Sequence, residues 1–365
     1  MRHKFNHLLI LVLSVLLFTS CNDENSTSSR IPKGDRLLGM DVLNTTPSID
    51  FNAGITKVKA AGVQFITFPV LWSDINATGA TYDATWVQNI KNMAVVCSAN
   101  GLKLSLTIWT VDTTGKHLPS DLMTTRFNDI TMANRFIDLL EKLFITESID
   151  YALLTSIQIG NEIDGYNVAG DSYFSWSDYA AFLYNVKLLI AAKPYSSLKT
   201  GFTGTLYGMN ADTAVFTALA GTVDILGVTY YPLNNDFTVK DSAVVSSDIS
   251  TFVGNYSATG KPIYMQEAGY QTGGTFCNSS ESKQAQFVQN IFDAWDTHNA
   301  SIKAVSFLRL NDVDNSSAIA TATQYGLVGN SGFIEYIQTL GFFNYDGTEK
   351  QAFEILSDNA HARGW

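Results

Sequence analysis

Two short apolar stretches end in residues that can carry acid–base and nucleophilic chemistry. Thr155–Ile163 is a run of apolar and small residues that contains the pair Asn161 and Glu162. Pro262–Gly269 is a second run, and it contains Glu267 near its end. Both runs are typical of strands that are buried on both faces. Two carboxylates brought to the same end of a parallel sheet suit glycoside hydrolysis, in which one carboxyl is protonated and the other is ionised.

Segments with strand and helix patterns alternate from residue 36 onward. The expected strands are Leu37–Val42, Val63–Pro69, Leu102–Trp109, Leu153–Gly160, Leu198–Thr205, Val223–Tyr231, Ile263–Glu267 and Lys303–Leu310. Helical patterns separate them, and an irregular loop leads from the eighth strand to a final helix at Thr348–Asn359. This order predicts an α/β fold in which residues 36–365 form a single (β/α)8 TIM barrel. A doubly wound open sheet would need a Gly-rich turn after the first strand, and Met40–Asn44 offers none.

The first 35 residues have the composition of a targeting and linker segment. Residues 1–20 combine a basic start with the apolar stretch Leu8–Phe18, which is typical of a signal peptide. Leu17–Cys21 resembles a bacterial lipoprotein box, so we expect cleavage before Cys21 and a lipid on its thiol. Residues 21–35 would be a flexible tether that holds the barrel at the bacterial cell envelope, on the periplasmic face or the outer-membrane surface. An ordinary cleaved signal peptide is the alternative.

Composition limits the partners that the chain can have. The formal net charge of −11 argues against nucleic acid or an anionic membrane surface as the main partner. Any membrane association is therefore expected only through the N-terminal lipid. The three cysteines show neither C-x-x-C spacing nor a dense, even set, so neither a metal site nor a disulfide framework is expected. We expect a monomer that uses no metal and no cofactor.

Functional residues of a barrel lie on the loops that follow the C-terminal ends of its strands. This rule selects Asn161, Glu162 and Glu267 as chemical candidates. Aromatic residues in the same places could stack on a sugar ring, with packing at the rim as the alternative for the first two. These aromatic candidates are Trp72, Trp109, Trp176, Tyr230 and Tyr231.

With these residues identified, the chain resembles the clan A retaining glycoside hydrolases, the TIM-barrel group that includes many cellulases, mannanases and galactanases. In that group an Asn-Glu pair ends the fourth strand and a Glu ends the seventh, as Asn161, Glu162 and Glu267 do here. The resemblance implies that Glu162 is the acid/base, that Glu267 is the nucleophile and that Asn161 binds the sugar 2-hydroxyl. It also implies that a tyrosine after the sixth strand contacts the nucleophile, and strand parity favours Tyr231 over Tyr230.

Three positions depart from the pattern of that group. Many members carry an arginine two residues before a Pro-Val-x-Trp run, where it helps to keep the nucleophile ionised, but this chain has Thr67. Arg309 could take its place, although the sequence does not say in which direction its side chain points. A histidine common before the sixth-strand tyrosine is Thr229 here, and a tryptophan common after the eighth strand is replaced by the run Phe307–Leu310.

The sequence therefore predicts a retaining O-glycosyl hydrolase that cleaves β-glycosidic bonds of a polysaccharide or oligosaccharide with two carboxylates. The alternative is a non-catalytic carbohydrate-binding lipoprotein on a degenerate glycosidase barrel. Glu162 and Glu267 favour the enzyme, whereas Thr67 favours the binding protein. The identity of the sugar, its linkage and the choice between endo and exo action stay open.

Overall fold

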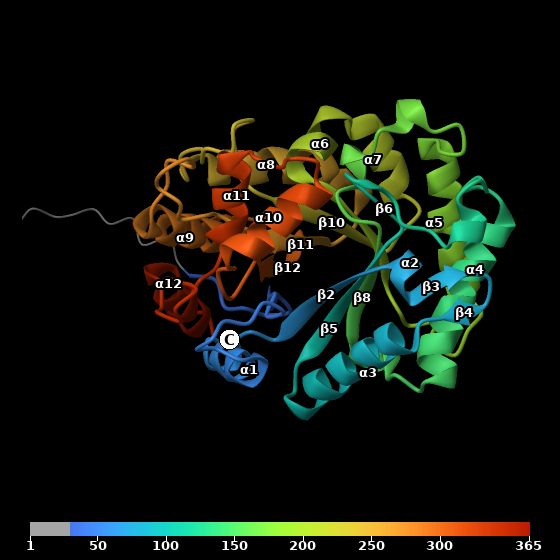
Figure 1. The fold of residues 1–365 in the computed structure, drawn as a ribbon, viewed down its shortest axis with the longest axis horizontal. Coiled ribbons are helices and arrows are strands. Elements are labelled where there is room, and N and C mark those ends of the chain that lie inside the picture. The colour runs from blue at the N-terminus through green and yellow to red at the C-terminus, as the bar shows by residue number, and fades with distance from the viewer. Residues whose placement is uncertain (1–29) are drawn as a thin grey trace, which may run out of the picture.

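Eight parallel strands close into a barrel in the order β1-β12-β11-β10-β9-β8-β5-β2 (Figure 1). The protein is described by a computed structural model that covers residues 30–365, so the predicted signal peptide and the lipid site at Cys21 lie outside the described residues. The barrel strands are β1 (Leu37–Met40), β2 (Phe65–Leu71), β5 (Lys103–Trp109), β8 (Leu154–Ile159), β9 (Thr200–Thr205), β10 (Ile225–Tyr230), β11 (Ile263–Ala268) and β12 (Ile302–Phe307). The predicted (β/α)8 fold is confirmed, and each predicted strand overlaps one barrel strand.

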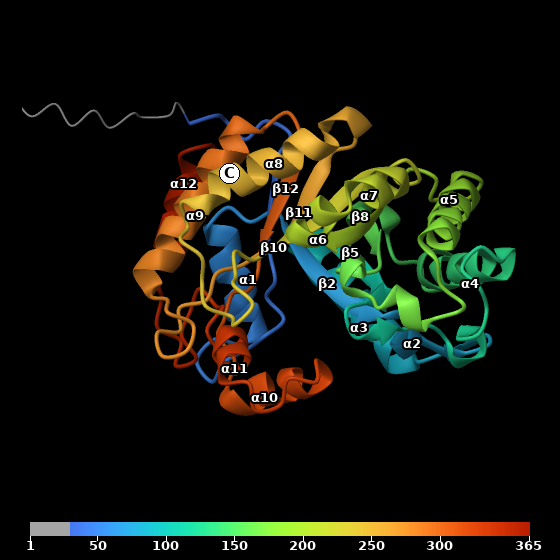
Figure 2. The same cartoon turned by 90° about the horizontal axis from the view of Figure 1, so that it is seen from above.

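Helices surround the barrel (Figures 1 and 2). They are α1 (Phe51–Ala60), α3 (Ala84–Ala99), α4 (Ile130–Glu141), α5 (Trp176–Ala191), α7 (Thr213–Ala220), α8 (Val244–Tyr256), α9 (Glu281–Thr297) and α12 (Gln351–His361). Asp50, Asp83 and Ser280 cap the first turns of α1, α3 and α9 by accepting a backbone N–H bond. Such caps satisfy donors that a helix start leaves free. Within residues 30–365, no helix has both the length and the apolar character needed to cross a membrane.

The loops at the C-terminal ends of the strands carry additional elements that the sequence did not predict. They are α2 (Trp72–Ile75), β3 (Asn76–Thr78), β4 (Thr81–Tyr82), β6 (Val111–Asp112), β7 (Gly115–Lys116), α6 (Leu206–Ala211), α10 (Asn315–Gln324) and α11 (Ser331–Gln338). The segment after the eighth strand was expected to be irregular, and the structure corrects this to the helical pair α10 and α11. The two helices lie side by side at one edge of the molecule (Figure 2).

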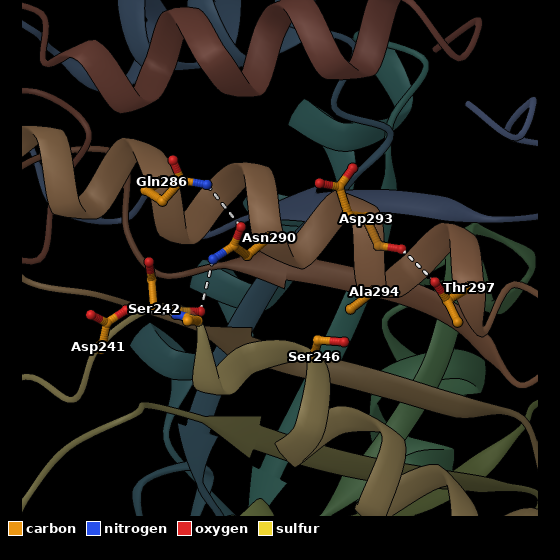
Figure 3. A pocket seen from close by; sticks show the side chains of 9 residues that line it. Asp241, Ser242, Ser246, Gln286, Asn290, Asp293, Ala294 and Thr297 are labelled. Atoms are coloured by element: carbon orange, nitrogen blue, oxygen red, sulfur yellow. Dashed lines mark hydrogen bonds between the residues drawn. The ribbon is translucent and has the colours of Figure 1, made fainter. Parts of the chain in front are cut away.

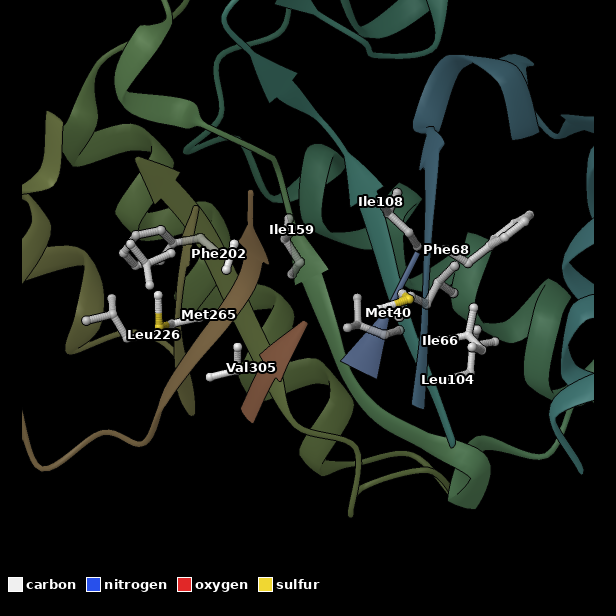
Figure 4. Packing of buried hydrophobic residues seen from close by; sticks show 14 of the residues in the cluster. Met40, Ile66, Phe68, Leu104, Ile108, Ile159, Phe202, Leu226, Met265 and Val305 are labelled. Carbon is white, nitrogen blue, oxygen red and sulfur yellow. The ribbon is translucent and has the colours of Figure 1, made fainter. Parts of the chain in front are cut away.

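Residues of the barrel strands alternate between an apolar outer face and a polar lumen. On β5, Leu104 and Ile108 are fully buried in the apolar core (Figure 4). The hydroxyl of Ser105, one position along, instead donates to the side-chain oxygen of Gln266 at 3.0 Å. Because β5 and β11 stand opposite each other in the barrel, this bond crosses the lumen. Polar side chains from opposite strands therefore meet inside the lumen.

The first described residues are attached to the body of the protein. The backbone N–H of Ile31 donates to Asp296 at 3.2 Å, and that of Lys33 donates to the carbonyl of Arg363 at 2.8 Å. The buried guanidinium of Arg36 forms an ion pair with Asp296 at 2.8 Å. Ile31 and Lys33, which were predicted to lie in the tether, therefore contact the barrel body.

Candidate active site

Glu162 stands just beyond the C-terminal end of β8, in an unusual backbone conformation. Gly160 and Glu162 both have a positive φ, 82° and 44°. Only glycine fits at position 160, because a Cβ there would lie 2.5 Å from the hydroxyl of Tyr179. A positive φ at a non-glycine residue costs about 1–3 kcal/mol, and such residues cluster at functional sites. The turn after β8 therefore directs the Glu162 carboxyl in a way that a regular strand would not.

A β-bulge orients Glu267 on β11. Val228 of β10 pairs with Met265, but the next residue, Thr229, pairs with Glu267, so Gln266 is the extra residue. In a regular strand, neighbouring side chains point to opposite faces. The bulge breaks this alternation. Gln266 points into the lumen, and the carboxyl of its neighbour Glu267 faces the barrel mouth, where it meets Tyr231.

The last residues of β10 and the residue that follows it donate one hydrogen bond to each carboxylate. The hydroxyl of Thr229 donates to Oε1 of Glu162 at 2.8 Å, and that of Tyr231 donates to Oε2 of Glu267 at 2.5 Å. Thr229 and Tyr231 are two positions apart and so share one face of the chain. The predicted contact between Tyr231 and Glu267 is thus present, and Thr229 contacts the other carboxylate.

The surroundings of the two carboxylates give them different affinities for a proton. Burial, followed by the charge of Glu267, raises the pKa of Glu162 to about 8. Burial also raises the pKa of Glu267, but the Tyr231 hydrogen bond and the Arg309 charge act to lower it. Glu267 therefore ionises first, and its charge then holds the proton on Glu162. Near neutral pH the pair combines one acid with one carboxylate, as glycoside hydrolysis requires.

Arg309 supplies a positive charge near Glu267. It follows β12, with the Leu308–Arg309 peptide bond in the cis form. Its charge lowers the pKa of both Glu267 and Asp41. Its Nε atom is buried and has no hydrogen-bond partner within residues 30–365. The Thr67 hydroxyl, in contrast, lies 2.9 Å from that of Ser306. The positive charge expected after the second strand is thus supplied by a residue that follows the eighth strand.

Asn161 lies directly beside Glu162 and is 5% exposed. Its backbone N–H donates to the carbonyl of Val111 at 3.0 Å, which fixes the turn. Among residues 30–365, its side-chain amide has no hydrogen-bond partner. The amide atoms are nevertheless not fully buried. The amide is therefore available to a hydroxyl that enters the mouth.

Two aromatic residues predicted to contact a sugar are in the core, so those predictions are wrong. Trp72 is 0% exposed, and its ring centroid lies 5.2 Å from that of Phe136. Tyr230 is also 0% exposed and donates its hydroxyl to Asp248 on α8 at 2.9 Å. Neither ring has an exposed face on which a sugar could stack. The strand patterns did not separate them from rim residues, because burial at a strand end depends on the surrounding loops.

Trp109 and Trp176, the other two tryptophans predicted to contact a sugar, are half-buried in different parts of the barrel. Trp109 follows Ser105 on β5 with an even spacing, so it faces the lumen side at the barrel mouth. Its ring centroid lies 6.5 Å from that of His117. Trp176 is the first residue of α5 and packs against Phe216 of α7, with 5.4 Å between centroids. The structure thus places Trp109 at the mouth and Trp176 in the helical layer.

Two tyrosines near the carboxylates were not identified from the sequence. The charges of Glu162 and Glu267 both raise the pKa of Tyr336, and the same charges raise that of Tyr325, in each case after burial. Tyr336 lies on α11, and its ring meets that of Tyr231 edge-on, with centroids 5.8 Å apart. The apolar spacing of Phe333, Tyr336 and Ile337 was the available signal for this helix.

Two clefts lie away from Glu162 and Glu267. One of about 400 Å³ is polar and lies between α8 and α9, where Asn290 donates to the carbonyl of Ser242 (Figure 3). The other, of about 500 Å³, is apolar, and Phe51, Trp86 and Met93 line it. Neither cleft is lined by Glu162 or Glu267. Within residues 30–365, no group of three or more His, Cys, Asp or Glu side chains is placed to hold a metal ion.

Solved structures similar to this chain include several glycoside hydrolases. An exo-β-1,4-mannosidase from Opitutaceae bacterium strain TAV5 is 14% identical with a TM-score of 0.67, over 90% of this chain and 59% of that one. A GH5_18 variant from Bifidobacterium longum subsp. longum ATCC 55813, in complex with Manβ1-4GlcNAc, is 15% identical with a TM-score of 0.65, over 89% and 78%. A β-glucosidase from Exiguobacterium marinum is 12% identical with a TM-score of 0.60, over 91% and 98%. No family model and no curated protein matches the chain. At these identities the likeness establishes the TIM-barrel fold.

Proposed function

We propose that this protein is a retaining glycoside hydrolase that cleaves β-glycosidic bonds of an oligosaccharide or polysaccharide. One observation carries the proposal. Glu162 and Glu267 lie at the ends of β8 and β11, Thr229 and Tyr231 each donate a hydrogen bond to one of them, and the charge of Glu267 helps to raise the pKa of Glu162. That protonation pattern matches the needs of an acid and a nucleophile.

The reaction proceeds in two displacements. In the first, a carboxylate oxygen of Glu267 attacks the anomeric carbon while the bond to the leaving oxygen breaks, and Glu162 gives that oxygen its proton. A glycosyl ester of Glu267 is formed. In the second, Glu162 takes a proton from water, the water oxygen attacks the anomeric carbon, and Glu267 leaves as a carboxylate. Two inversions at one carbon give net retention.

The surrounding residues support each stage of this cycle. The Tyr231 hydroxyl and the Arg309 charge stabilise the ionised form of Glu267 before attack. Once the ester forms, the negative charge of Glu267 is gone, so the pKa of Glu162 falls and it can act as a base. The amide of Asn161 is placed to bind the hydroxyl next to the anomeric carbon.

The non-catalytic alternative depended on the absence of an arginine at Thr67. That argument is weaker because Arg309 brings its charge to Glu267 from another strand. The same substrate class would be bound in either case, so only turnover separates the two functions.

The test is a substrate panel assayed with the parent and the Glu267→Gln variant. β-1,4-Manno-oligosaccharides and Manβ1-4GlcNAc lead the panel, because similar structures are a β-1,4-mannosidase and a complex with that disaccharide. β-Glucans, galactans and xylans complete it. We expect the parent to release sugar and the variant to release none, with the product first formed as the β-anomer in proton NMR. Binding without release by the parent would replace the enzyme with a carbohydrate-binding protein.

We also propose that a lipid on Cys21 holds the protein at the cell envelope. In bacteria that process lipoproteins, the parent should fractionate with membranes, whereas Cys21→Ala should not. Equal fractionation of the two would refute the anchor and leave the enzymatic proposal unaffected.

A further inference from the structure

Asp41 directly follows β1, and its side chain points toward the barrel mouth. Leu38, Met40 and Val42 are all buried in the apolar core, where Figure 4 shows Met40. Neighbouring side chains of an extended chain point in opposite directions, so Asp41 points to the lumen side. Because Asp41 lies beyond the C-terminal end of its strand, the lumen side at this level is the barrel mouth.

Hydrogen bonds hold the loop that begins at Asp41 against the segment that follows β12. The backbone N–H of Asp41 donates to the carbonyl of Phe307 at 3.1 Å, and its carbonyl accepts from the N–H of Leu310 at 2.8 Å. Further along, the side-chain amide of Asn311 donates to the carbonyl of Asn44 at 2.7 Å. The position of Asp41 is therefore fixed relative to the end of the eighth strand.

The eighth strand in turn places Asp41 two strands away from Glu267. Phe307 pairs with Met40 of β1 on one side and with Ala268 of β11 on the other. Neighbouring strands lie about 4.8 Å apart, so the ends of β1 and β11 are separated by about 10 Å. Side chains that extend from both strands shorten this separation to the scale of one sugar ring. In agreement, the charge of Asp41 acts to raise the pKa of Glu267.

One carboxylate oxygen of Asp41 has a protein partner, and the other has none. Oδ1 accepts a hydrogen bond from the backbone N–H of Leu43 at 2.8 Å. Within residues 30–365, Oδ2 has no hydrogen-bond or ion-pair partner, although the residue is only 7% exposed. Oδ2 is also not among the fully buried atoms, so it is open to the mouth. Carboxylate oxygens in such enclosed places are normally hydrogen-bonded, because loss of water is costly. The free oxygen therefore indicates a donor that enters the mouth from outside.

The two catalytic carboxylates set the direction in which the cleaved sugar lies. In the proposed mechanism, Glu162 protonates the leaving oxygen and Glu267 bonds the anomeric carbon. In the strand order, β10 and β9 separate β11 from β8, which carries Glu162, whereas β12 and β1 continue on the other side. The leaving group is therefore on the β8 side, and the retained sugar extends from Glu267 toward β1. Because Asn161 also follows β8 and binds the C2 hydroxyl, the ring edge that reaches β1 is the one opposite C2, which carries the C6 hydroxymethyl group.

We propose that Asp41 binds the C6 hydroxyl of the sugar held at the nucleophile, so that the protein selects hexose units over pentoses. An ionised carboxylate oxygen is a hydrogen-bond acceptor only, and a hydroxyl is the donor that it lacks here. The inference rests on the proposed glycosidase function. It specifies the substrate as a β-linked hexopyranose whose C6 hydroxyl is free.

The test combines a hydroxyl missing from the substrate with a carboxylate missing from the protein. The probes are 4-nitrophenyl β-D-mannoside and β-D-glucoside, the matching β-mannobioside and β-cellobioside, and the analogue of each that lacks the C6 hydroxyl on the sugar joined to the aryl group. 4-Nitrophenyl β-D-xyloside lacks the whole hydroxymethyl group and completes the set. We expect kcat/KM of the parent to be about 10–100-fold lower for the 6-deoxy form of its preferred glycoside, the range for a hydrogen bond to a charged group. The xyloside should be no better than that 6-deoxy form.

The variants separate sugar binding from a structural role. Asp41→Ala should lose a similar factor on the intact glycoside but change little on its 6-deoxy form, because the bond is already absent there. Asp41→Asn keeps an acceptor for the Leu43 N–H but replaces the free oxygen by a donor, so its preference for the intact glycoside should also fall. Asp150→Ala is the matched control. Oδ1 of Asp150 accepts from the N–H of Ala152 at 2.9 Å, with the same spacing as in the Asp41 turn, but before β8 instead of after a strand. This control should behave as the parent on every probe.

Each outcome decides the inference. Equal kcat/KM of the parent for the intact and 6-deoxy glycosides overturns it and leaves the glycosidase function intact. An equal loss by Asp41→Ala on both forms shows a structural role and also overturns it, and Asp41→Asn takes its place in this comparison if the alanine variant does not fold. No cleavage of any probe by the parent overturns the inference, and the proposed function falls with it when the polysaccharide and oligosaccharide panel is also left intact.

Discussion

The barrel body and the α10–α11 pair are built from different kinds of contact. The body is held by parallel strand pairing and by a large apolar core that runs through most of its strands and helices. The pair belongs to a second, smaller cluster that includes Phe333, Tyr336 and Leu340. Glu162 and Glu267 take their positions from the body, through a strand end and a bulge. The pair contributes rings that border the same carboxylates. The body thus positions the two carboxylates, and the pair packs its aromatic rings against Tyr231 beside them.

The largest expected loss of turnover follows substitution of Glu267, which the barrel body positions. Glu267→Gln removes the nucleophile but keeps the shape of the side chain, so turnover should fall by about 10⁴-fold or more. The product pattern is then no longer measurable, but binding of an oligosaccharide should persist, because the mouth is unchanged. Turnover is measured as released sugar, and binding by calorimetry. Residual activity above about one per cent of the parent would contradict the nucleophile assignment.

The next largest loss of turnover is expected for Glu162→Gln. Comparing substrates with poor and good leaving groups tests its role as the acid. Glu162→Gln should slow cleavage of natural sugars by about 10²–10⁴-fold, because it removes the acid. An aryl glycoside with a good leaving group needs no such proton in the first step, so its glycosylation should slow far less. In the parent, activity should fall as the pH rises through about 8, since Glu162 must be protonated. The variant should lack this alkaline decline. An equal loss for both leaving groups would refute the role.

The raised pKa of Glu162 also predicts a change in stability. Its pKa rises in the folded state from an ordinary value near 4.5 to about 8. The folded state therefore holds the proton more tightly, and stability is lost as the pH rises between these values. Glu162→Gln cannot ionise, so its melting temperature should exceed that of the parent by more at pH 9 than at pH 5. Thr229→Val, which removes only a hydrogen bond to Glu162, serves as a comparison.

A pair of core substitutions compares the two regions directly. Trp72→Ala in the body removes a fully buried ring packed on Phe136 and Phe182, and should cost about 3–5 kcal/mol of stability. Phe333→Ala in the second cluster should cost less, because its neighbours lie at the edge of the molecule and can adjust. It should instead lower turnover, since it loosens Tyr336, whose ring packs on both Phe333 and Tyr231. The measurements are chemical denaturation and released sugar. Equal losses of stability with unchanged turnover would remove the distinction between the regions.

The smallest effect concerns Arg309, which lies where the two regions meet. Arg309→Met removes a charge that lowers the pKa of Glu267, so the acidic limb of the pH–rate profile should move up by about one unit. Activity should therefore fall more at pH 5 than at pH 7. Arg309→Lys keeps the charge and should restore much of the profile. An unshifted acidic limb in the methionine variant would show that Arg309 does not act on the nucleophile.

The amino-acid sequence by itself determined the barrel and the positions of the two candidate carboxylates at its strand ends. Strand order and helix order follow from local periodicity, which depends on nearby residues. The rule that strand ends meet at one face was enough to bring Glu162 and Glu267 together, and strand parity correctly favoured Tyr231 over Tyr230. These features depend on backbone geometry that repeats along the chain.

The tertiary structure alone decided which side chains surround the carboxylates at the barrel mouth. The effect of Arg309 on Glu267, the burial of Trp72 and the packing of Tyr336 on Tyr231 all depend on loops that are distant in sequence and close in space. The helices α10 and α11 are short, and their apolar residues pack with residues from other loops, such as Cys277 and Tyr231. No local pattern states which loop a side chain will meet, because that contact is set by long-range packing.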